Sequence, residues 1–261
     1  MYHLIIQARM GSRRLPGKSL KKYKGITPLE VLINRVKAIK QIKKIIISTT
    51  KLDQDNIFLN YAKKLKVDIF YGSSNNVLKR YFDTAKKFKS KKIIRLTPDC
   101  PFIDPKTLKK MIKIYDKNKF DYLSNTYPFP CTFPDGSDIE ILNYHTLKKT
   151  YESAILPSDK EHVTKYIFNS KKFICKRIDC KRDLSKYRYT IDILEDYKLY
   201  KFILKNNFRN YKNLTMNQII KIIDKNPHMI KYQKKLRRNF GWDSALEKDI
   251  RYIKKLKQKF Q

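Results

Sequence analysis

Residues 1–18 read MYHLIIQARMGSRRLPGK and hold the two features that decide the fold. First, Leu4, Ile5 and Ile6 form a continuous apolar run, which is typical of a strand buried on both faces of a parallel sheet. Second, a loop of cationic side chains follows this strand at once: Arg9, Arg13, Arg14 and Lys18. Open α/β sheets bind ligands at the carboxyl ends of their strands, so we expect this loop to form part of a ligand site.

The same alternation of apolar run and amphipathic stretch continues along the first half of the chain. Further strands are predicted at residues 45–49, 67–71 and 93–96. Helices with apolar residues at helical spacing are predicted between and after them, at residues 28–39, 54–65, 77–88 and 105–118. This order predicts an α/β, Rossmann-like fold, with a mostly parallel sheet and helices on both faces.

The second half of the chain is less regular. Residues 125–138 hold three prolines and Asp135-Gly136, so we predict a loop or hairpin there that covers a site. Later strands are predicted at residues 138–142, 173–178 and 188–191, and a helix near Tyr144. From Leu194 the chain is mostly helical and very basic. We therefore predict a core domain over residues 1–210 and a helical appendage over residues 211–261, which packs on the core or serves in a dimer.

The loop after the first strand has the chemistry of a phosphate-binding loop. Gly11 and Gly17 let the backbone turn tightly and approach a ligand closely. Backbone N–H groups and guanidinium groups together suit a polyphosphate. The loop is not a Walker A loop, because Gly11 and Gly17 are one residue too far apart for that motif, and it is not a GxGxxG loop. By physics alone, a basic surface loop in a lysine-rich chain is an equally good interpretation.

The formal net charge of +36 has two interpretations. Nucleic-acid binding is one, since a phosphate backbone attracts dispersed Lys and Arg. A biased genome is the other, because the lysines are spread along the whole chain and are not clustered with aromatic residues. We favour the second and do not expect nucleic acid as a partner. The charge would still attract anionic substrates such as nucleoside triphosphates.

The four cysteines and the apolar runs exclude several other classes of protein. The cysteines form no CxxC pair, so we predict free thiols and neither a zinc site nor a disulfide framework. We find no apolar run of about 18 residues and no secretory signal, so a cytoplasmic location is the expectation.

Several motifs together resemble one enzyme family. The string from Ala8 to Lys18 resembles the signature of the acylneuraminate and Kdo cytidylyltransferases, and more narrowly the branch of spore coat polysaccharide biosynthesis protein F. The other matching motifs follow in the expected order along nearly the whole chain: Gly72-Ser73, Arg95 to Pro105, Asp121-Tyr122, Pro134 to Glu140, Ser158 to Thr164, Tyr189 to Asp196, Asn226-Pro227 and Asn239-Phe240-Gly241. This resemblance implies a GT-A-like nucleotidyltransferase fold.

The resemblance also implies a reaction. CTP and a sugar acid would give the CMP-sugar and pyrophosphate, for surface polysaccharide biosynthesis, with Mg²⁺ as the cofactor. The site must gather a highly charged triphosphate, align the attacking hydroxyl and stabilise the charge that develops. Magnesium is typically held by one or two carboxylates plus phosphate oxygens. A homodimer is a further implication.

The resemblance assigns roles residue by residue. The implied metal ligands are Asp99 and Asp192, and the implied catalytic residues are Arg9, Lys18 and Asp99. The implied nucleotide contacts are Ala8, Arg9, Met10, Gly11, Ser12, Arg14, Lys18, Ser48, Thr49 and Gly72. The implied contacts to the acceptor are Asp135, Asp138, Glu140 and His162.

Each key residue also has a plainer interpretation. Asp99 is followed by Pro101 and Pro105, so it could cap a helix, and Asp192 with Glu195 has the spacing of a capping box. A lone His such as His162 is more often a structural hydrogen bonder than a catalyst.

The chain differs from the branch at three positions that bear on nucleotide choice. Pro98 stands where the branch usually has Gly, and Asn75 and Asn76 stand where it usually has acidic residues. An enzyme that uses GTP or UTP on the same scaffold, or a glycosyltransferase, therefore remains an alternative. Asp53-Gln54-Asp55 has the spacing of a glycosyltransferase metal motif, but it coincides with a predicted helix start.

Overall fold

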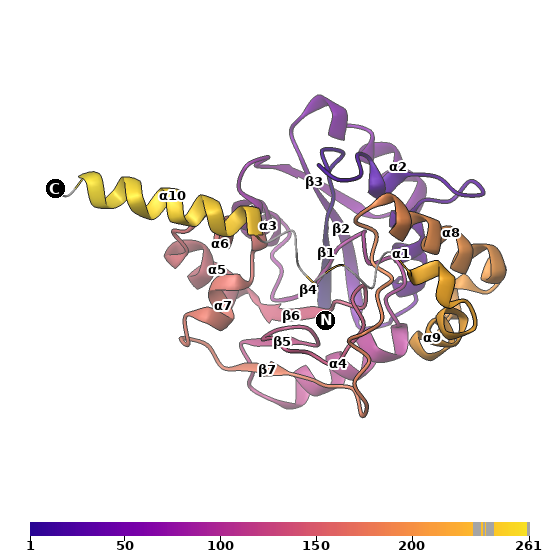
Figure 1. The fold of residues 1–261 in the computed structure, drawn as a ribbon. Coiled ribbons are helices and arrows are strands. Elements are labelled where there is room, and N and C mark those ends of the chain that lie inside the picture. The colour runs from indigo at the N-terminus through magenta and orange to yellow at the C-terminus, as the bar shows by residue number, and fades with distance from the viewer. Residues whose placement is uncertain (232–235, 237, 239–242, 260–261) are drawn as a thin grey trace.

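The computed structural model describes residues 1–231, 236, 238 and 243–259 (Figure 1). Within these residues a seven-stranded sheet has the order β3-β2-β1-β4-β6-β5-β7. The strands are β1 (Tyr2–Gln7), β2 (Ile42–Thr50), β3 (Asp68–Gly72), β4 (Lys92–Leu96), β5 (Tyr122–Ser124), β6 (Glu140–Asn143) and β7 (Cys175–Arg177).

The sheet is mostly parallel, as predicted. Strands β1 to β4 pair in parallel, and β7 pairs in parallel with β5. Strand β6 is antiparallel to both of its neighbours, β4 and β5. The carboxyl ends of β1, β2 and β4 therefore meet the amino end of β6 at one edge of the sheet.

Helices cover the two faces of this sheet. The helices of the described residues are α1 (Pro28–Val36), α2 (Phe58–Leu65), α3 (Val77–Lys87), α4 (Pro105–Lys117), α5 (Tyr144–Ser153), α6 (Pro157–His162), α7 (Lys165–Asn169), α8 (Leu194–Asn207), α9 (Met216–Lys225) and α10 (Asp243–Lys259). Short 3₁₀ helices lie at η1 (Lys18–Leu20), η2 (Asp53–Asp55), η3 (Tyr211–Asn213) and η4 (Pro227–Ile230).

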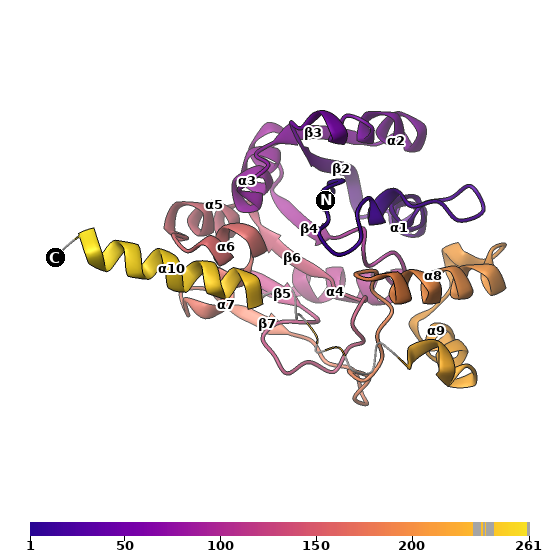
Figure 2. The ribbon, with the colours of Figure 1, turned by 45° about the horizontal axis from the view of Figure 1, so that its top comes forward.

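The alternation of side chains along β1 builds a core on each face. Leu4 and Ile6 pack with α1, α2 and α4, whereas Ile5 packs on the opposite face with α3, α5 and α7. Figure 2 shows α1 and α4 on one side of the strands and α3 and α5 on the other. Leu4, Ile5 and Ile6 are fully buried, which explains the apolar run in the middle of β1, because both faces of the strand are covered. This arrangement confirms the Rossmann-like fold with helices on both faces.

Two of the predicted elements were wrong in detail. Residues 188–191 form no strand, and the segment makes only an isolated bridge between Asp135 and Arg188. The reason is that its backbone groups bond to two different loops: Tyr189 N–H donates to Asp135 O at 2.8 Å, and Ile191 N–H donates to Asp99 O at 2.8 Å. The predicted helix at 54–65 is divided into η2 and α2.

The C-terminal part of the described chain packs in two places. Helices α8 and α9 enclose a further apolar cluster that includes Tyr200, Ile203 and Ile219 and reaches Val31 of α1. Helix α10 lies on the opposite side of the molecule, against α6, and extends away from the body (Figure 1). The division of the chain at residue 210 stays a prediction.

A buried polar cluster attaches α10 to α6. Asp249 Oδ1 accepts the backbone N–H of Ser158 at 2.8 Å, and Asp249 Oδ2 accepts the Ser158 hydroxyl. Lys165 Nζ lies 3.3 Å from Asp249 Oδ2 and 3.8 Å from Asp159 Oδ1. All four side chains are buried. A buried charge pair of this kind is costly to break, since the remaining partner loses its compensation.

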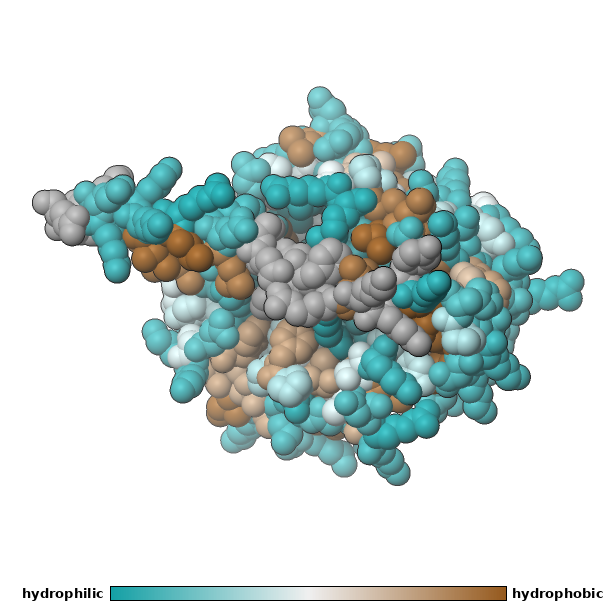
Figure 3. All heavy atoms as spheres, viewed as in Figure 1, coloured by the Kyte–Doolittle hydropathy of each residue, from teal (hydrophilic) through white to brown (hydrophobic). Residues whose placement is uncertain are grey.

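Outside this attachment, α10 is amphipathic. Leu246, Ile250 and Ile253 are all exposed. Figure 3 shows a hydrophobic patch along α10 within a mainly hydrophilic face. Among the helices of the described residues, none is both long and apolar enough to cross a membrane.

We predict that Asp249→Ala lowers the free energy of unfolding by about 3 kcal/mol or more, because Lys165 and the Ser158 N–H would be left buried without this partner. Urea denaturation followed by circular dichroism measures the change. The matched control is Glu247→Ala, since Glu247 is exposed on the same helix, and it should stay within about 0.5 kcal/mol of the parent. Equal stability of the two variants would contradict the buried cluster.

Candidate active site

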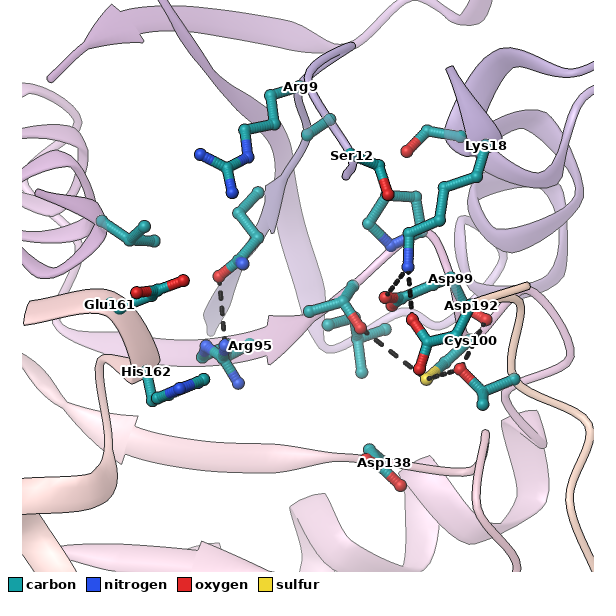
Figure 4. A pocket seen from close by; sticks show the side chains of 18 of the residues that line it. Arg9, Ser12, Lys18, Arg95, Asp99, Cys100, Asp138, Glu161, His162 and Asp192 are labelled. Carbon is teal, nitrogen blue, oxygen red and sulfur yellow. Dashed lines mark hydrogen bonds and ion pairs between the residues drawn. The ribbon is translucent and has the colours of Figure 1, made fainter. Parts of the chain in front are cut away.

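A cavity of about 330 Å³ opens at the edge where β1, β4 and β6 meet. Figure 4 shows Lys18, Asp99 and Asp192 at one end and Arg95, Glu161 and His162 at the other, with Arg9 above them. The predicted site residues that line it are Ala8, Arg9, Ser12, Arg14, Lys18, Asp99, Asp135, Asp138, Glu140, His162 and Asp192. The predicted residues outside its lining are Met10, Gly11, Ser48, Thr49 and Gly72.

Lys18 joins the two predicted metal ligands. Its Nζ lies 2.7 Å from Asp99 Oδ2 and 2.7 Å from Asp192 Oδ1. Asp192 is also contacted by Arg14 at 3.1 Å and by Arg188 at 3.2 Å. Burial alone would raise the pKa of Asp192, but the cations around it, Lys18 above all, hold that pKa well below its ordinary value. Asp192 is therefore ionised at neutral pH.

The capping interpretations of both aspartates are wrong. The N-cap of α4 is Asp104, whose side chain accepts the N–H of Lys106. The N-cap of α8 is Ile193, and its backbone N–H donates to Asp196 and not to Glu195. Asp99 and Asp192 are thus not used as helix caps, and both carboxylates face Lys18.

The two carboxylates fit a magnesium site. Because an oxygen of each lies 2.7 Å from the same Lys18 nitrogen, one small cation could contact both of them. Mg²⁺ usually takes one or two carboxylates and completes its shell with water and phosphate oxygens. Within the described residues, no cluster of three or more His, Cys, Asp or Glu residues could hold a metal. The donor set therefore suits a metal that arrives with a phosphate ligand.

Three of the residues outside the cavity lining, Ser48, Thr49 and Gly72, lie on β2 and β3. Ser48 is fully buried at the end of β2 and its hydroxyl bonds to Thr84 of α3 at 2.8 Å. At Gly72 an added Cβ would lie only 2.8 Å from the Arg80 side chain, so glycine leaves room for Arg80 to pass. Arg80 itself lines the cavity. It belongs to the motif Arg80-Tyr81 that resembles the branch, but no role was predicted for it. Contacts of Ser48, Thr49 and Gly72 with a nucleotide stay predictions.

At the far end of the cavity, Arg95 of β4 forms a largely buried ion pair. Its Nη1 lies 2.6 Å from Glu140 Oε1, and its Nη2 donates to Gln7 Oε1 at 3.1 Å. The guanidinium also lies over the ring of Tyr81. Arg95 belongs to the motif from Arg95 to Pro105, but no role was predicted for it. The available signal was a charged residue inside an otherwise apolar strand.

Helix α6 supplies Glu161 and His162 to the same end of the cavity. Glu161 pairs with Lys248 of α10 at 2.8 Å. Burial lowers the pKa of His162 to about 4, so its imidazole is neutral at physiological pH. Neither α6 nor the pairing of Glu161 was predicted.

The predicted covering loop, residues 125–138, forms one wall of the cavity. Arg177 donates to the carbonyl of Pro128 at 2.7 Å, and Arg238 donates to the carbonyl of Phe133 at 2.7 Å and to Asp138 Oδ1 at 2.7 Å. Burial raises the pKa of Asp135 to about 6, although its ion pair with Arg188 opposes this shift. The two arginines hold the loop in place along this wall of the cavity.

The three departures from the branch fit the local structure. Pro98 is the second residue of a turn closed by Cys100 N–H and Thr97 O at 3.0 Å, a position where the fixed φ of proline is favourable. Asn76 is the N-cap of α3 and accepts the N–H of Lys79 at 2.8 Å, which Asn does as well as Asp. Asn75 makes only an exposed contact with Ser74.

The comparisons with known proteins decide the family. The family model described as cytidylyltransferase matches residues 3–259. The chain belongs to the cytidylyltransferase family, and it is a nucleotidyltransferase enzyme. The matched range includes Asn239-Phe240-Gly241, which lie outside the described residues.

Two curated relatives share about a third of their residues with this cytidylyltransferase. The spore coat polysaccharide biosynthesis protein SpsF of Bacillus subtilis is 32% identical over 85% of the chain and 94% of its own length. An uncharacterized protein of Methanocaldococcus jannaschii is 34% identical over 86% of the chain and 91% of its own length. These matches confirm the resemblance to the SpsF branch.

Solved structures agree with the fold. A cytidylyltransferase from Leptospira borgpetersenii is 36% identical, with a TM-score of 0.82 over 90% of this chain and 98% of its own. A CMP:2-keto-3-deoxy-manno-octonic acid synthetase, solved with CTP, is 14% identical with a TM-score of 0.60 over 78% of this chain and 98% of its own. At that identity the second similarity shows the fold alone.

We predict that His162 makes folding sensitive to acid. Its folded pKa of about 4 is set by burial and lies below the ordinary value near 6.5, so between these pH values the unfolded chain binds a proton that the folded protein does not. The contribution of His162 to the free energy of unfolding is fully present above pH 6.5 and is lost as the pH falls towards 4.

Thermal or urea unfolding at pH 7.5 and pH 5 checks this expectation. The parent should lose about 2 kcal/mol more than His162→Gln over this interval. Arg95, Lys165 and Lys248 add to the depression of the His162 pKa, and Glu161 opposes it. Parallel pH profiles for parent and variant would show that His162 is not buried as described.

Proposed function

We propose that this enzyme activates a sugar acid as its CMP derivative, with CTP as the nucleotide and Mg²⁺ as the cofactor. The observation that carries the proposal is the convergence of Lys18, Asp99 and Asp192 beside a loop of arginines. This places cations for a triphosphate next to two carboxylates that suit a metal. The family membership and the SpsF relative support the same reaction class.

The residues of the chain would divide the work by position. Arg9, Ser12, Arg14 and Lys18 lie on the segment after β1 and would hold the triphosphate. The three cations would neutralise its charge, and the Ser12 hydroxyl would donate a hydrogen bond to it. Asp99 and Asp192 would hold the metal ion, which when bound neutralises charge on the phosphates. Lys18 would exchange part of its contact with the carboxylates for a phosphate oxygen.

The far end of the cavity would hold the acceptor. Arg95 is held in place by Glu140 and Gln7. Its guanidinium would bind the carboxylate of a sugar acid at that end of the cavity. Asp138, Glu161 and the neutral imidazole of His162 would accept or donate hydrogen bonds to hydroxyl groups. Binding both substrates in one cavity would align the anomeric hydroxyl with the α-phosphate.

The destination of the product follows from the relative's name. We propose that the CMP-sugar enters surface polysaccharide biosynthesis, as the name of the SpsF relative suggests. The homodimer and the cytoplasmic location stay predictions from the sequence.

A thermal-shift series tests the nucleotide assignment. The protein is melted with CTP, UTP, GTP, ATP or a short oligonucleotide, each with and without Mg²⁺. We expect CTP with Mg²⁺ to raise Tm most, since a ligand of the folded state stabilises by RT ln(1 + [L]/Kd). Asp99→Asn should lose the Mg²⁺ dependence, whereas Asp53→Asn, which changes an exposed carboxylate, should keep it.

The other outcomes are distinct. A larger shift with UTP or GTP would keep the scaffold and change the nucleotide. A shift with the oligonucleotide alone would overturn the enzymatic proposal in favour of nucleic-acid binding. Pyrophosphate release with a panel of sugar acids then identifies the acceptor.

A further inference from the structure

The backbone of Met10 is fixed from both sides. Its N–H donates to Asp55 Oδ1 at 2.7 Å, and its carbonyl accepts the N–H groups of Ser12 at 2.8 Å and Gly17 at 3.0 Å. The carbonyl bonds close the loop on itself. The N–H bond is different, because it attaches the loop to η2, which is 45 residues further along the chain.

Asp55 is suited to hold this N–H in one place. Its side chain is fully buried, and its second oxygen accepts the hydroxyl of Thr50. Thr50 is the last residue of β2, is itself fully buried, and accepts the N–H of Leu52 at 3.2 Å. The carboxylate therefore has two donors and is fixed to the end of β2, which is paired on both sides.

The loop is attached to β2 at a second point. The N–H of Ala8 donates to the carbonyl of Ser48 at 3.1 Å. Arg9 stands between the two attached residues, and its side chain is exposed and directed into the cavity (Figure 4). The direction of Arg9 thus depends on where Ala8 and Met10 are held.

The neighbouring residues of η2 do not share this role. Asp53 is exposed, so the two carboxylates of Asp53-Gln54-Asp55 do not converge as a glycosyltransferase metal motif requires. Gln54 packs beside Gly11, where an added Cβ would lie 3.6 Å from its side-chain nitrogen.

We propose that Asp55 is the positioning residue of the nucleotide loop: it fixes the Met10 peptide to β2 and so sets the affinity for the nucleoside triphosphate. This inference rests on the proposed function. Holding the loop before the ligand arrives lowers the cost of ordering it on binding. Asp55 acts through the backbone and contacts no substrate.

The test compares nucleotide affinity with stability. Asp55→Ala, Asp55→Asn and the matched control Asp53→Ala are titrated with CTP and UTP in the presence of Mg²⁺ by calorimetry. Each titration is run well below the Tm of that variant, with folding checked by circular dichroism. We expect Asp55→Ala to weaken CTP binding at least about tenfold, which corresponds to about 1.4 kcal/mol.

The two other variants give the contrast. Asp55→Asn keeps an oxygen that can accept the Met10 N–H, so it should bind CTP more tightly than Asp55→Ala does. If Asp55→Ala does not fold, the CTP affinity of Asp55→Asn tests the inference instead. For Asp55→Asn we expect a loss of about threefold, with faster hydrogen exchange at the Met10 amide. Asp53→Ala should bind CTP like the parent.

The outcomes separate this inference from the proposed function. If the Asp55 variants melt at lower temperature but bind CTP like the parent, Asp55 is only structural and the inference is overturned, while the proposed function stands. If the parent itself binds no nucleotide, the proposed function fails and the inference fails with it.

Discussion

The structure of the site depends on one cation that satisfies two carboxylates. Lys18 Nζ lies 2.7 Å from both Asp99 and Asp192, residues that are 81 and 174 positions away in the chain. Without a cation between them, two carboxylates at this spacing would repel each other. The ion pairs therefore hold the loop after β1, the turn after β4 and the segment before α8 in one place.

The sheet delivers these segments because of its strand directions. Strands β1 and β4 are adjacent and parallel, so the residues after them, Arg9 and Asp99, emerge at the same edge. Strand β6 runs the other way and brings its first residue, Glu140, to that edge. Reversal of one strand thus brings Glu140 to the edge where the cationic loop and Asp99 lie.

The sequence predicts the parts that follow from local patterns. The apolar runs around Ile5 and Ile94 indicate buried parallel strands, because both faces of those strands are covered. The positions of Asp99 and Lys18 in the cavity agree with motif resemblance. Arg95 was part of a quoted motif but received no role, because only the structure shows that its charge is paired with Glu140.

Other features depend on contacts between distant residues. Residues 188–191 have strand-like composition, but their backbone groups bond to the loops at Asp99 and Asp135 instead of to a strand. The same applies to Asp55, whose spacing to Asp53 indicates a metal motif. Burial at one position and exposure at the other decide against it. The sequence next to residues 188–191 or to Asp55 does not indicate which distant residues their polar groups contact.

The attachment of α10 to α6 has a consequence for biosynthesis. The chain leaves the ribosome with its N-terminus first, so the central strands and the cationic loop can fold early. Ser158, next to Glu161 and His162 on the wall of the cavity, receives its partner Asp249 only when 249 of the 261 residues have been made. Helix α6, which carries Glu161 and His162 on the wall of the cavity, therefore gains its attachment to α10 later than the strands form, and a chain that stops before Asp249 lacks this attachment.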